Sequence, residues 1–176
     1  MEVSEGVPQE TETIEIEHTF SEPRMEKVRE TEYYSIRMKD TQKYYDKPGL
    51  PLVPFKTAKI PIPEGRDVEI INVAPGKKVV IKGQFKIEYA KQQIPIQPPS
   101  KVETKLKPEV ETEPNMEVYG SSSPFPGKLY SVVSTQYQRG SKILILNLYP
   151  VQYIPTSGEI SYYQKMKVVV TTVPTG

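Results

Sequence analysis

The sequence contains no cysteine and a single histidine among its 176 residues. Without cysteine the chain can hold no disulfide framework, no cysteine-ligated zinc and no cysteine nucleophile. General-base mechanisms usually need a histidine, and here the candidate is His18, beside Ile16 and Phe20 on one face of an alternating segment. Packing explains that position better than catalysis. We therefore predict no catalytic residue, no cofactor and no metal site in this chain.

Strong net charge and long apolar runs are also missing. The formal net charge of +1 argues against nucleic acid as a partner. No segment approaches the ~18–20 apolar residues of a membrane span. The residues after Met1 do not resemble a signal peptide, so for an exported protein the signal would already have been removed.

Charge is nevertheless unevenly placed along the chain. Residues 1–32 carry ten glutamates against three basic residues, a net of −7, and the rest of the chain carries +8. This acidic arm could lie against the basic body or a partner, or could be a solvated leader. We predict an acidic leader over residues 1–30, with an edge strand at 12–20, followed by a single domain over residues 31–173.

Alternating apolar and polar residues predict an all-β fold, an antiparallel β-sandwich or jelly roll. In the edge strand, Ile14, Ile16, His18 and Phe20 share one face, and glutamates lie on the other. Two turns are predicted, at Arg139-Gly140-Ser141 and at Pro155–Gly158. Further strands are predicted at residues 31–39, 67–73, 78–89, 128–138, 142–149 and 159–170.

Two proline-rich segments interrupt this pattern. Residues 47–65 hold too many prolines for a central strand and are predicted to be an extended connection across the surface. Residues 91–117 contain five prolines and no glycine. Their glutamates do not follow a calcium-loop spacing. A loop of this length inside a compact domain is usually functional or disordered.

Tyrosine is the enriched residue type that could serve binding. Its amphipathic ring suits protein interfaces and sugar-binding faces, but strand tyrosines also fill the core and rim of a sandwich. The sequence leaves both interpretations open. The tyrosines in question include Tyr33, Tyr34, Tyr44, Tyr45, Tyr130, Tyr137, Tyr149, Tyr153, Tyr162 and Tyr163.

The C-terminal third, "YQRGSKILILNLYPVQYIPTSGEISYYQKMKVVV", resembles the end of the N-terminal prodomain of gingipain-type (family C25, clan CD) cysteine peptidases. An Arg-Gly turn, a Tyr-Pro-Val-x-Tyr strand and a Pro-Thr-x-Gly turn match in order and spacing. The residues that carry this signature are Arg139, Gly140, Tyr149, Pro150, Tyr153, Pro155 and Gly158. Upstream, "PGLP", "IPIPEGRDVEI", "QPP" and "VYGSSSPFPG" extend the resemblance over about residues 47–170.

The resemblance implies a non-catalytic, secreted or cell-surface β-sandwich that assists the folding of a downstream cysteine peptidase and blocks its active-site cleft until cleaved. In such prodomains a basic residue on a loop enters the specificity pocket. The candidate loop is 91–117, with Lys101, Lys105 or Lys107 as the inserted residue. Lys107 precedes Pro108, and a Lys–Pro bond lacks the amide N–H and resists most peptidases. The alternative is a surface module that binds carbohydrate or protein through its tyrosines.

Overall fold

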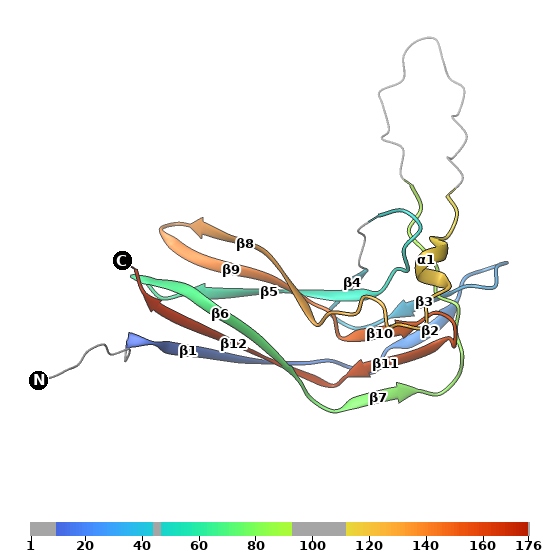
Figure 1. Ribbon diagram of the computed structural model, residues 1–176, viewed down its shortest axis with the longest axis horizontal. Helices are drawn as coiled ribbons and strands as arrows, with labels where there is room; N and C mark the ends of the chain where they lie inside the picture. The colour runs from blue at the N-terminus through green and yellow to red at the C-terminus, as the bar shows by residue number, and fades with distance from the viewer. Residues whose placement is uncertain (1–9, 44–46, 93–111, 176) are drawn as a thin grey trace, which may run out of the picture.

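The computed structural model describes residues 10–43, 47–92 and 112–175, which form an antiparallel β-sandwich (Figure 1). The all-β prediction is confirmed. The elements in chain order are β1 (Glu12–Thr19), β2 (Arg24–Lys27), β3 (Tyr34–Arg37), β4 (Gln42–Lys43), β5 (Pro54–Ile62), β6 (Arg66–Pro75), β7 (Lys78–Ile81), α1 (Met116–Tyr119), β8 (Tyr130–Gln138), β9 (Ser141–Leu148), β10 (Val151–Ile154), β11 (Glu159–Tyr163) and β12 (Lys165–Pro174).

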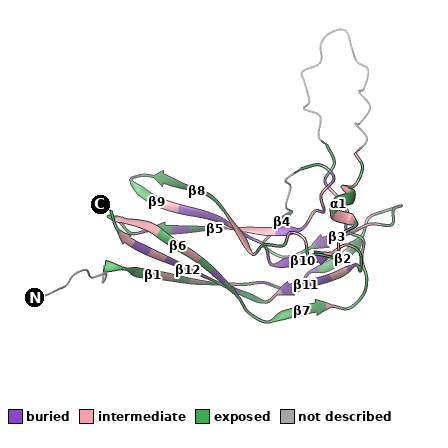
Figure 2. Cartoon of the chain, viewed as in Figure 1, coloured by how far each residue is buried: buried purple, intermediate pink, exposed green. Residues whose placement is uncertain are grey.

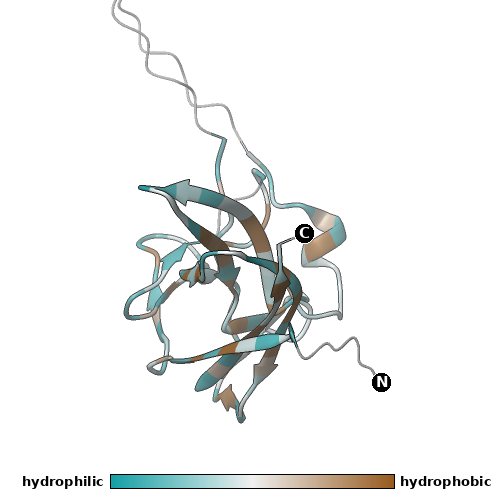
Figure 3. Cartoon of the chain, turned by 90° about the vertical axis from the view of Figure 1, so that its left-hand side faces the viewer, coloured by the Kyte–Doolittle hydropathy of each residue, from teal (hydrophilic) through white to brown (hydrophobic). Residues whose placement is uncertain are grey.

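The strands are arranged in two halves of an elongated molecule (Figure 1). In one half, the sheet β1-β12-β6 faces the sheet β4-β5-β9-β8. The other half contains the sheet β10-β11-β7, the hairpin β2-β3 and helix α1. Seen end-on, the strands surround a central core, and apolar residues alternate with polar ones along them (Figure 3).

Each half has its own hydrophobic core, visible as buried stretches of the strands in Figure 2. The sandwich core lies between the two facing sheets and contains Phe20, Ala58, Ile60, Ile62, Val73, Leu144, Leu146, Leu148, Met166, Val168 and Val170. The hairpin core contains Ile36, Val53, Ile87, Val151, Tyr153, Ile160 and Tyr162. Met38 packs against both cores, so the two halves are in contact through it.

Two interruptions divide what would otherwise be long strands between the halves. β9 passes to β10 through Tyr149-Pro150, and β11 passes to β12 through Gln164. Proline has no N–H to donate, so a ladder stops where it lies. Its carbonyl is still used, because Pro150 accepts a hydrogen bond from the N–H of Tyr163 at 3.0 Å. The prediction that this stretch is a hairpin with a Pro155–Gly158 turn is confirmed.

β1 is an edge strand, as predicted. It pairs along its whole length with β12, from Glu12 opposite Thr172 to Thr19 opposite Lys165. Ile14, Ile16 and His18 are half-buried, while the glutamates between them are exposed. Residues 12–19 therefore belong to the sandwich.

The prediction for residues 47–65 is wrong over Pro54–Ile62, which form β5. β5 pairs with β9 from Lys56 to Ile62, and β4 covers its other side only at Pro54 and Phe55. Beyond Phe55 this side of β5 has no strand partner among the described residues, so a proline there costs no ladder bond. Pro61 is accordingly exposed, while Ile60 and Ile62 on either side of it are buried.

The single strand predicted over Lys78–Tyr89 is also wrong beyond Ile81, where β7 ends. Gly83 has φ +120°, and the ring of Phe85 occupies the space of its missing side chain, 2.9 Å from an ideal Cβ. The chain therefore turns at Gly83 and continues as isolated bridges, with Ile87 beside Tyr34 and Tyr89 beside Pro51. The predicted inward face is partly retained, because Ile87 is fully buried.

Candidate functional site

The loop lysines singled out by the sequence, Lys101, Lys105 and Lys107, and Pro108 lie outside the described residues. The described ends of that loop approach each other at what we call the loop base, residues 89–92 and 112–115. The N–H of Gln92 donates to Oγ1 of Thr112 at 2.8 Å, and the hydroxyl of Tyr89 donates to the carbonyl of Thr112 at 3.0 Å. The two legs of the loop are therefore bonded directly to each other.

Gly49 bonds both legs of the loop base. Its N–H donates to the carbonyl of Ala90 at 2.7 Å, and its carbonyl accepts from the N–H of Asn115 at 2.9 Å. Its φ is +91°, and an ideal Cβ would lie 2.9 Å from the carbonyl oxygen of Glu113. Only glycine combines that backbone conformation with that close approach.

Replacing Gly49 with alanine should loosen the loop base by about 1–3 kcal/mol, because the methyl group must displace Glu113 and the backbone is strained at positive φ. We expect hydrogen exchange at the amide of Asn115 to accelerate by at least about tenfold. Gly65→Ala is the matched control, since Gly65 has φ +80° and an ideal Cβ there would lie more than 4 Å from every other described residue that is not its chain neighbour. Equal hydrogen-exchange rates at the amide of Asn115 in both variants would show that Gly49 does not hold the loop base together.

Helix α1 continues the second leg. Asn115 is its N-cap, and Oδ1 accepts from the N–H groups of Glu117 at 2.9 Å and Val118 at 3.2 Å. Glu117 adds a favourable negative charge in the first turn. The cap fixes the start of α1 directly after the loop base, and the helix then presents Tyr119 towards Ile87.

A row of four tyrosines, Tyr33, Tyr89, Tyr119 and Tyr153, packs next to the loop base. Successive rings meet edge-to-face, with centroid separations of 5.4 Å for Tyr33–Tyr89, 6.2 Å for Tyr89–Tyr119 and 6.3 Å for Tyr119–Tyr153. Two hydroxyls bond the backbone of one residue: that of Tyr153 accepts from the N–H of Ile87 at 3.2 Å, and that of Tyr119 donates to the carbonyl of Ile87. Burial raises the pKa of both phenols, so both stay neutral hydrogen-bonding groups.

Lysines lie on the outside of this tyrosine row. Lys86 lies over the ring of Tyr33 at 4.9 Å and pairs with Glu32 at 2.9 Å, and this hydrogen bond raises its pKa. Lys91 lies over the ring of Tyr89 at 5.1 Å. Both ammonium groups thus flank the first leg with cation–π geometry.

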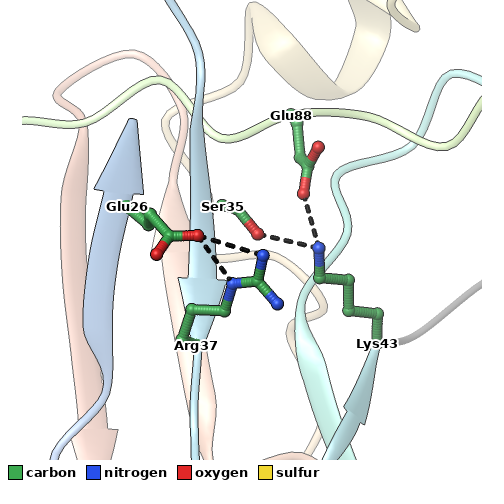
Figure 4. A network of polar contacts seen from close by, with 5 residues as sticks. All are labelled: Glu26, Ser35, Arg37, Lys43 and Glu88. Atoms are coloured by element: carbon green, nitrogen blue, oxygen red, sulfur yellow. Dashed lines mark hydrogen bonds and ion pairs between the residues drawn. The ribbon is translucent and has the colours of Figure 1, made fainter. Parts of the chain in front are cut away.

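A polar network joins the segment before the loop base to the hairpin core (Figure 4). The ammonium of Lys43 donates to Oγ of the buried Ser35 at 2.7 Å and to the carboxylate of Glu88 at 2.8 Å. Next to it, Arg37 on β3 pairs with Glu26 on β2 at 3.0 Å. Lys43 therefore holds β3, β4 and residue 88 together close to the first leg.

A groove of about 400 Å³ lies between α1 and the Pro155–Gly158 turn, lined by residues that include Phe85, Lys86, Pro114, Met116, Tyr119 and Pro155. Its lining holds no nucleophile–base pair. Across the described ranges, no group of three or more histidine, aspartate or glutamate side chains is placed to hold a metal ion.

The signature residues occupy structural positions. Arg139 and Gly140 have φ +51° and +81° and form the turn between β8 and β9. The buried hydroxyl of Tyr149 shares a hydrogen bond with Ser131 at 2.8 Å. Gly158 has φ +77° and accepts a hydrogen bond from the N–H of Phe85 at 2.9 Å. Tyr153 and Gly158 therefore connect the C-terminal hairpin to the segment that leads into the loop base.

His18 is half-buried on β1, and its buried Nε2 has no hydrogen-bond partner among the described residues. Burial, and secondarily the charge of Lys56, lower its pKa. The unfolded chain therefore binds a proton more readily, and the stabilising effect of a neutral His18 is present above pH ~6.5 and lost as the pH falls below it. This environment fits a packed histidine.

We expect the free energy of unfolding of the wild type to decrease between pH 7 and pH 5, and His18→Phe to remove part of this dependence. Phenylalanine keeps an aromatic ring in place but cannot take up a proton. Urea titrations at several pH values measure the effect. If the free energy of unfolding changed with pH by the same amount in both proteins, His18 would make no contribution to the pH dependence.

These features define a class of protein. It is a β-sandwich in which hydrogen bonds hold the two ends of a long loop together, and its described residues include no catalytic site. Residues 3–176 match the model of the C25 propeptide family, Propeptide_C25, and the chain belongs to this family. It is a non-catalytic region of a cysteine peptidase zymogen. This match also covers the acidic leader, whereas the resemblance seen in the sequence covers only about residues 47–170.

Two solved structures share this fold. One, from work on the zymogenic latency of gingipain K from Porphyromonas gingivalis, has a TM-score of 0.71 at 20% identity over 93% of this chain and 88% of that chain. The other, the complex of P. gingivalis RgpB pro- and mature domains, has a TM-score of 0.63 at 13% identity over 93% and 80%. No curated protein sequence matches significantly. None of the described helices is long and apolar enough to cross a membrane.

Proposed function

We propose that this chain holds a secreted or surface cysteine peptidase of family C25 latent by laying the 91–117 loop across its active-site cleft until the prodomain is removed. The peptidase would be the downstream domain of the same precursor. The observation that carries the proposal is the loop base, in which Gly49, Tyr89 and Thr112 bind both legs of the loop to the sandwich. A loop held by rigid elements loses less entropy when it binds.

Within the loop, Lys101, Lys105 and Lys107 are the candidates for the residue that enters the specificity pocket. Lys107 is the first choice because the following Pro108 removes the amide N–H of the bond that a peptidase would cut. A side chain in that position can fill the pocket without the loop being consumed.

The test is the inhibition constant of the 176-residue chain against its cognate catalytic domain. We expect Lys107→Ala to weaken inhibition by roughly 30-fold or more, the loss typical of a central interface residue. A triple alanine variant of the exposed lysines Lys39, Lys59 and Lys82 controls for overall charge. Unchanged inhibition in the Lys101/Lys105/Lys107 triple alanine variant would overturn the loop proposal.

We also propose that the prodomain assists folding of its peptidase. The measurement is the yield of active peptidase after denaturation and refolding with and without the separate prodomain. The loop triple variant distinguishes the two roles, because it should lose inhibition while still raising the yield.

The alternative, carbohydrate or protein binding through tyrosines, has less support. Tyr149, Tyr153 and Tyr162 are buried, and Tyr33, Tyr89 and Tyr119 pack against one another. Tyr44 and Tyr45 lie outside the described residues. Glycan-array binding without any effect on a C25 peptidase would favour this alternative.

A further inference from the structure

β8 is an exposed edge strand that carries neither charge nor proline, and its one irregularity is the register shift between Val132 and Ser134. Among the described residues, its one strand partner in the sheet β4-β5-β9-β8 is β9. Its sequence, "YSVVSTQYQ", contains neither a charged residue nor a proline. Three of its large apolar or aromatic side chains are more than half exposed: Val132 at 52%, Val133 at 52% and Tyr137 at 72%. Charge and proline are two of the devices by which edge strands usually avoid pairing with other chains.

The other edges in the described part of the chain differ from β8. β1, β2, β3, β4, β6 and β7 all carry charged residues, for example the three glutamates of β1. β10 has no charge but is mostly buried, and Phe125 bonds its edge, with N–H groups and carbonyls exchanged with Tyr153 at 2.7 and 2.8 Å. β8 is therefore the uncharged edge that stays accessible.

The outer backbone groups of β8 can be assigned from its register. The two-residue turn at Arg139-Gly140 places Gln138 opposite Ser141 as the first hydrogen-bonded pair with β9. Hydrogen-bonded and non-hydrogen-bonded pairs then alternate. Gln136 accordingly bonds β9, whereas the N–H and carbonyl groups of Thr135 and Tyr137 point to the open edge.

We propose that a second copy of this chain pairs with this edge, β8 antiparallel to β8, about a twofold axis at Gln136. The register shifts between Val132 and Ser134, so the regular part of the strand is Ser134–Gln138, with Gln136 at its midpoint. Thr135 of one copy then lies opposite Tyr137 of the other, and the two exchange backbone hydrogen bonds on both sides of the axis. The proposal does not depend on the latency function.

An identical copy suits this edge because of its charge pattern. When two identical strands pair around a twofold axis, each residue lies opposite the same residue, or a nearby one, of the second copy. A charged edge such as β1 would therefore bring glutamates of the two copies together. β8 opposes Gln136 with Gln136, whose amides can bond each other, and Thr135 with Tyr137. β-Branched and aromatic residues are favourable cross-strand partners. A pairing of this length makes a small interface and a weak dimer.

The first test is sedimentation equilibrium of the full chain at increasing concentration. We expect reversible dimerisation that Gln136→Lys and Gln136→Glu each weaken by about fivefold, since like charges then lie opposite each other. An equimolar mixture of the two variants should recover dimers, because opposite charges meet at the axis. A monomeric wild type, or variants that associate as the wild type does, would overturn the proposal.

The second test uses the absence of native cysteine. At a non-hydrogen-bonded pair the Cα atoms are about 4.5 Å apart, within disulfide range, so Gln136→Cys should cross-link under mild oxidation. Gln138→Cys is the control, because residue 138 would lie opposite Ser134 of the second copy. Equal cross-linking of both variants contradicts the register. A monomeric chain whose Thr135 and Tyr137 amides become protected only by the mature peptidase would assign the edge to that partner instead.

Discussion

Replacing Tyr153 with alanine is expected to lower the free energy of unfolding by about 3–5 kcal/mol, the cost of removing a large aromatic side chain from a core. Tyr153 is fully buried in the hairpin core. Its ring meets that of Tyr119 edge-to-face at 6.3 Å, and its hydroxyl accepts the N–H of Ile87 at 3.2 Å. Urea titration followed by circular dichroism measures the loss.

Tyr153→Phe separates the ring from the hydroxyl. It keeps the packing but leaves the buried N–H of Ile87 without its acceptor, which should cost about 1–3 kcal/mol. Because the carbonyl of the same residue is held by Tyr119, we also expect the tyrosine row beneath the loop base to loosen. Equal destabilisation by alanine and phenylalanine would mean that the ring contributes nothing, contrary to the packing.

The sequence was sufficient where neighbouring residues determine the structure. Alternation alone predicts β1 and the face that it buries. The stretch Arg139-Gly140-Ser141 predicts a turn; the structure places the turn at Arg139 and Gly140, both with positive φ, and Ser141 begins β9. The hairpin around Pro155–Gly158 is likewise encoded locally and also carries the family signature. In each case the pattern of about ten consecutive residues is enough to favour one secondary structure over the others.

Prediction failed where the effect of a residue depends on a distant strand. Pro61 excludes a strand only if its missing N–H should face a partner, and among the described residues β5 has no partner on that side beyond Phe55. Alternation from Lys78 to Tyr89 indicates which residues face inward, yet Gly83 turns the chain between them. A glycine inside an alternating run was the available signal of that break.

The loop base could not be derived from the sequence at all. Its hydrogen bonds join Gly49, Ala90 and Asn115, which are brought together only by the finished fold. The tyrosine row similarly unites rings from four separate segments. The composition indicated that tyrosines matter, but not that they support a loop. The candidate lysines remain predictions, and the structure adds the support that would present them.

Replacing Gly158 with alanine is expected to cost about 2–5 kcal/mol, because two penalties combine. Its φ of +77° is unfavourable for any residue with a side chain, and an ideal Cβ would lie 2.7 Å from the backbone nitrogen of Phe85. Because the atom in the way belongs to the backbone of Phe85, it cannot move aside by rotation as the end of a flexible side chain can. The turn must therefore separate from residues 84–86, and the hydrogen bond from Phe85 to Gly158, 2.9 Å long, is lost.

Gly140→Ala provides a control in the same protein. Gly140 has φ +81°, but in the described part of the chain nothing apart from its own neighbours in sequence lies within 4 Å of an ideal Cβ. Only the backbone penalty of about 1–2 kcal/mol therefore applies. The difference between the two variants in urea titrations then measures the close approach of the turn to Phe85. Equal losses would show that residues 84–86 yield without cost. A larger loss at Gly158 would explain the signature glycine as a packing requirement that connects the C-terminal hairpin to the segment leading into the loop base.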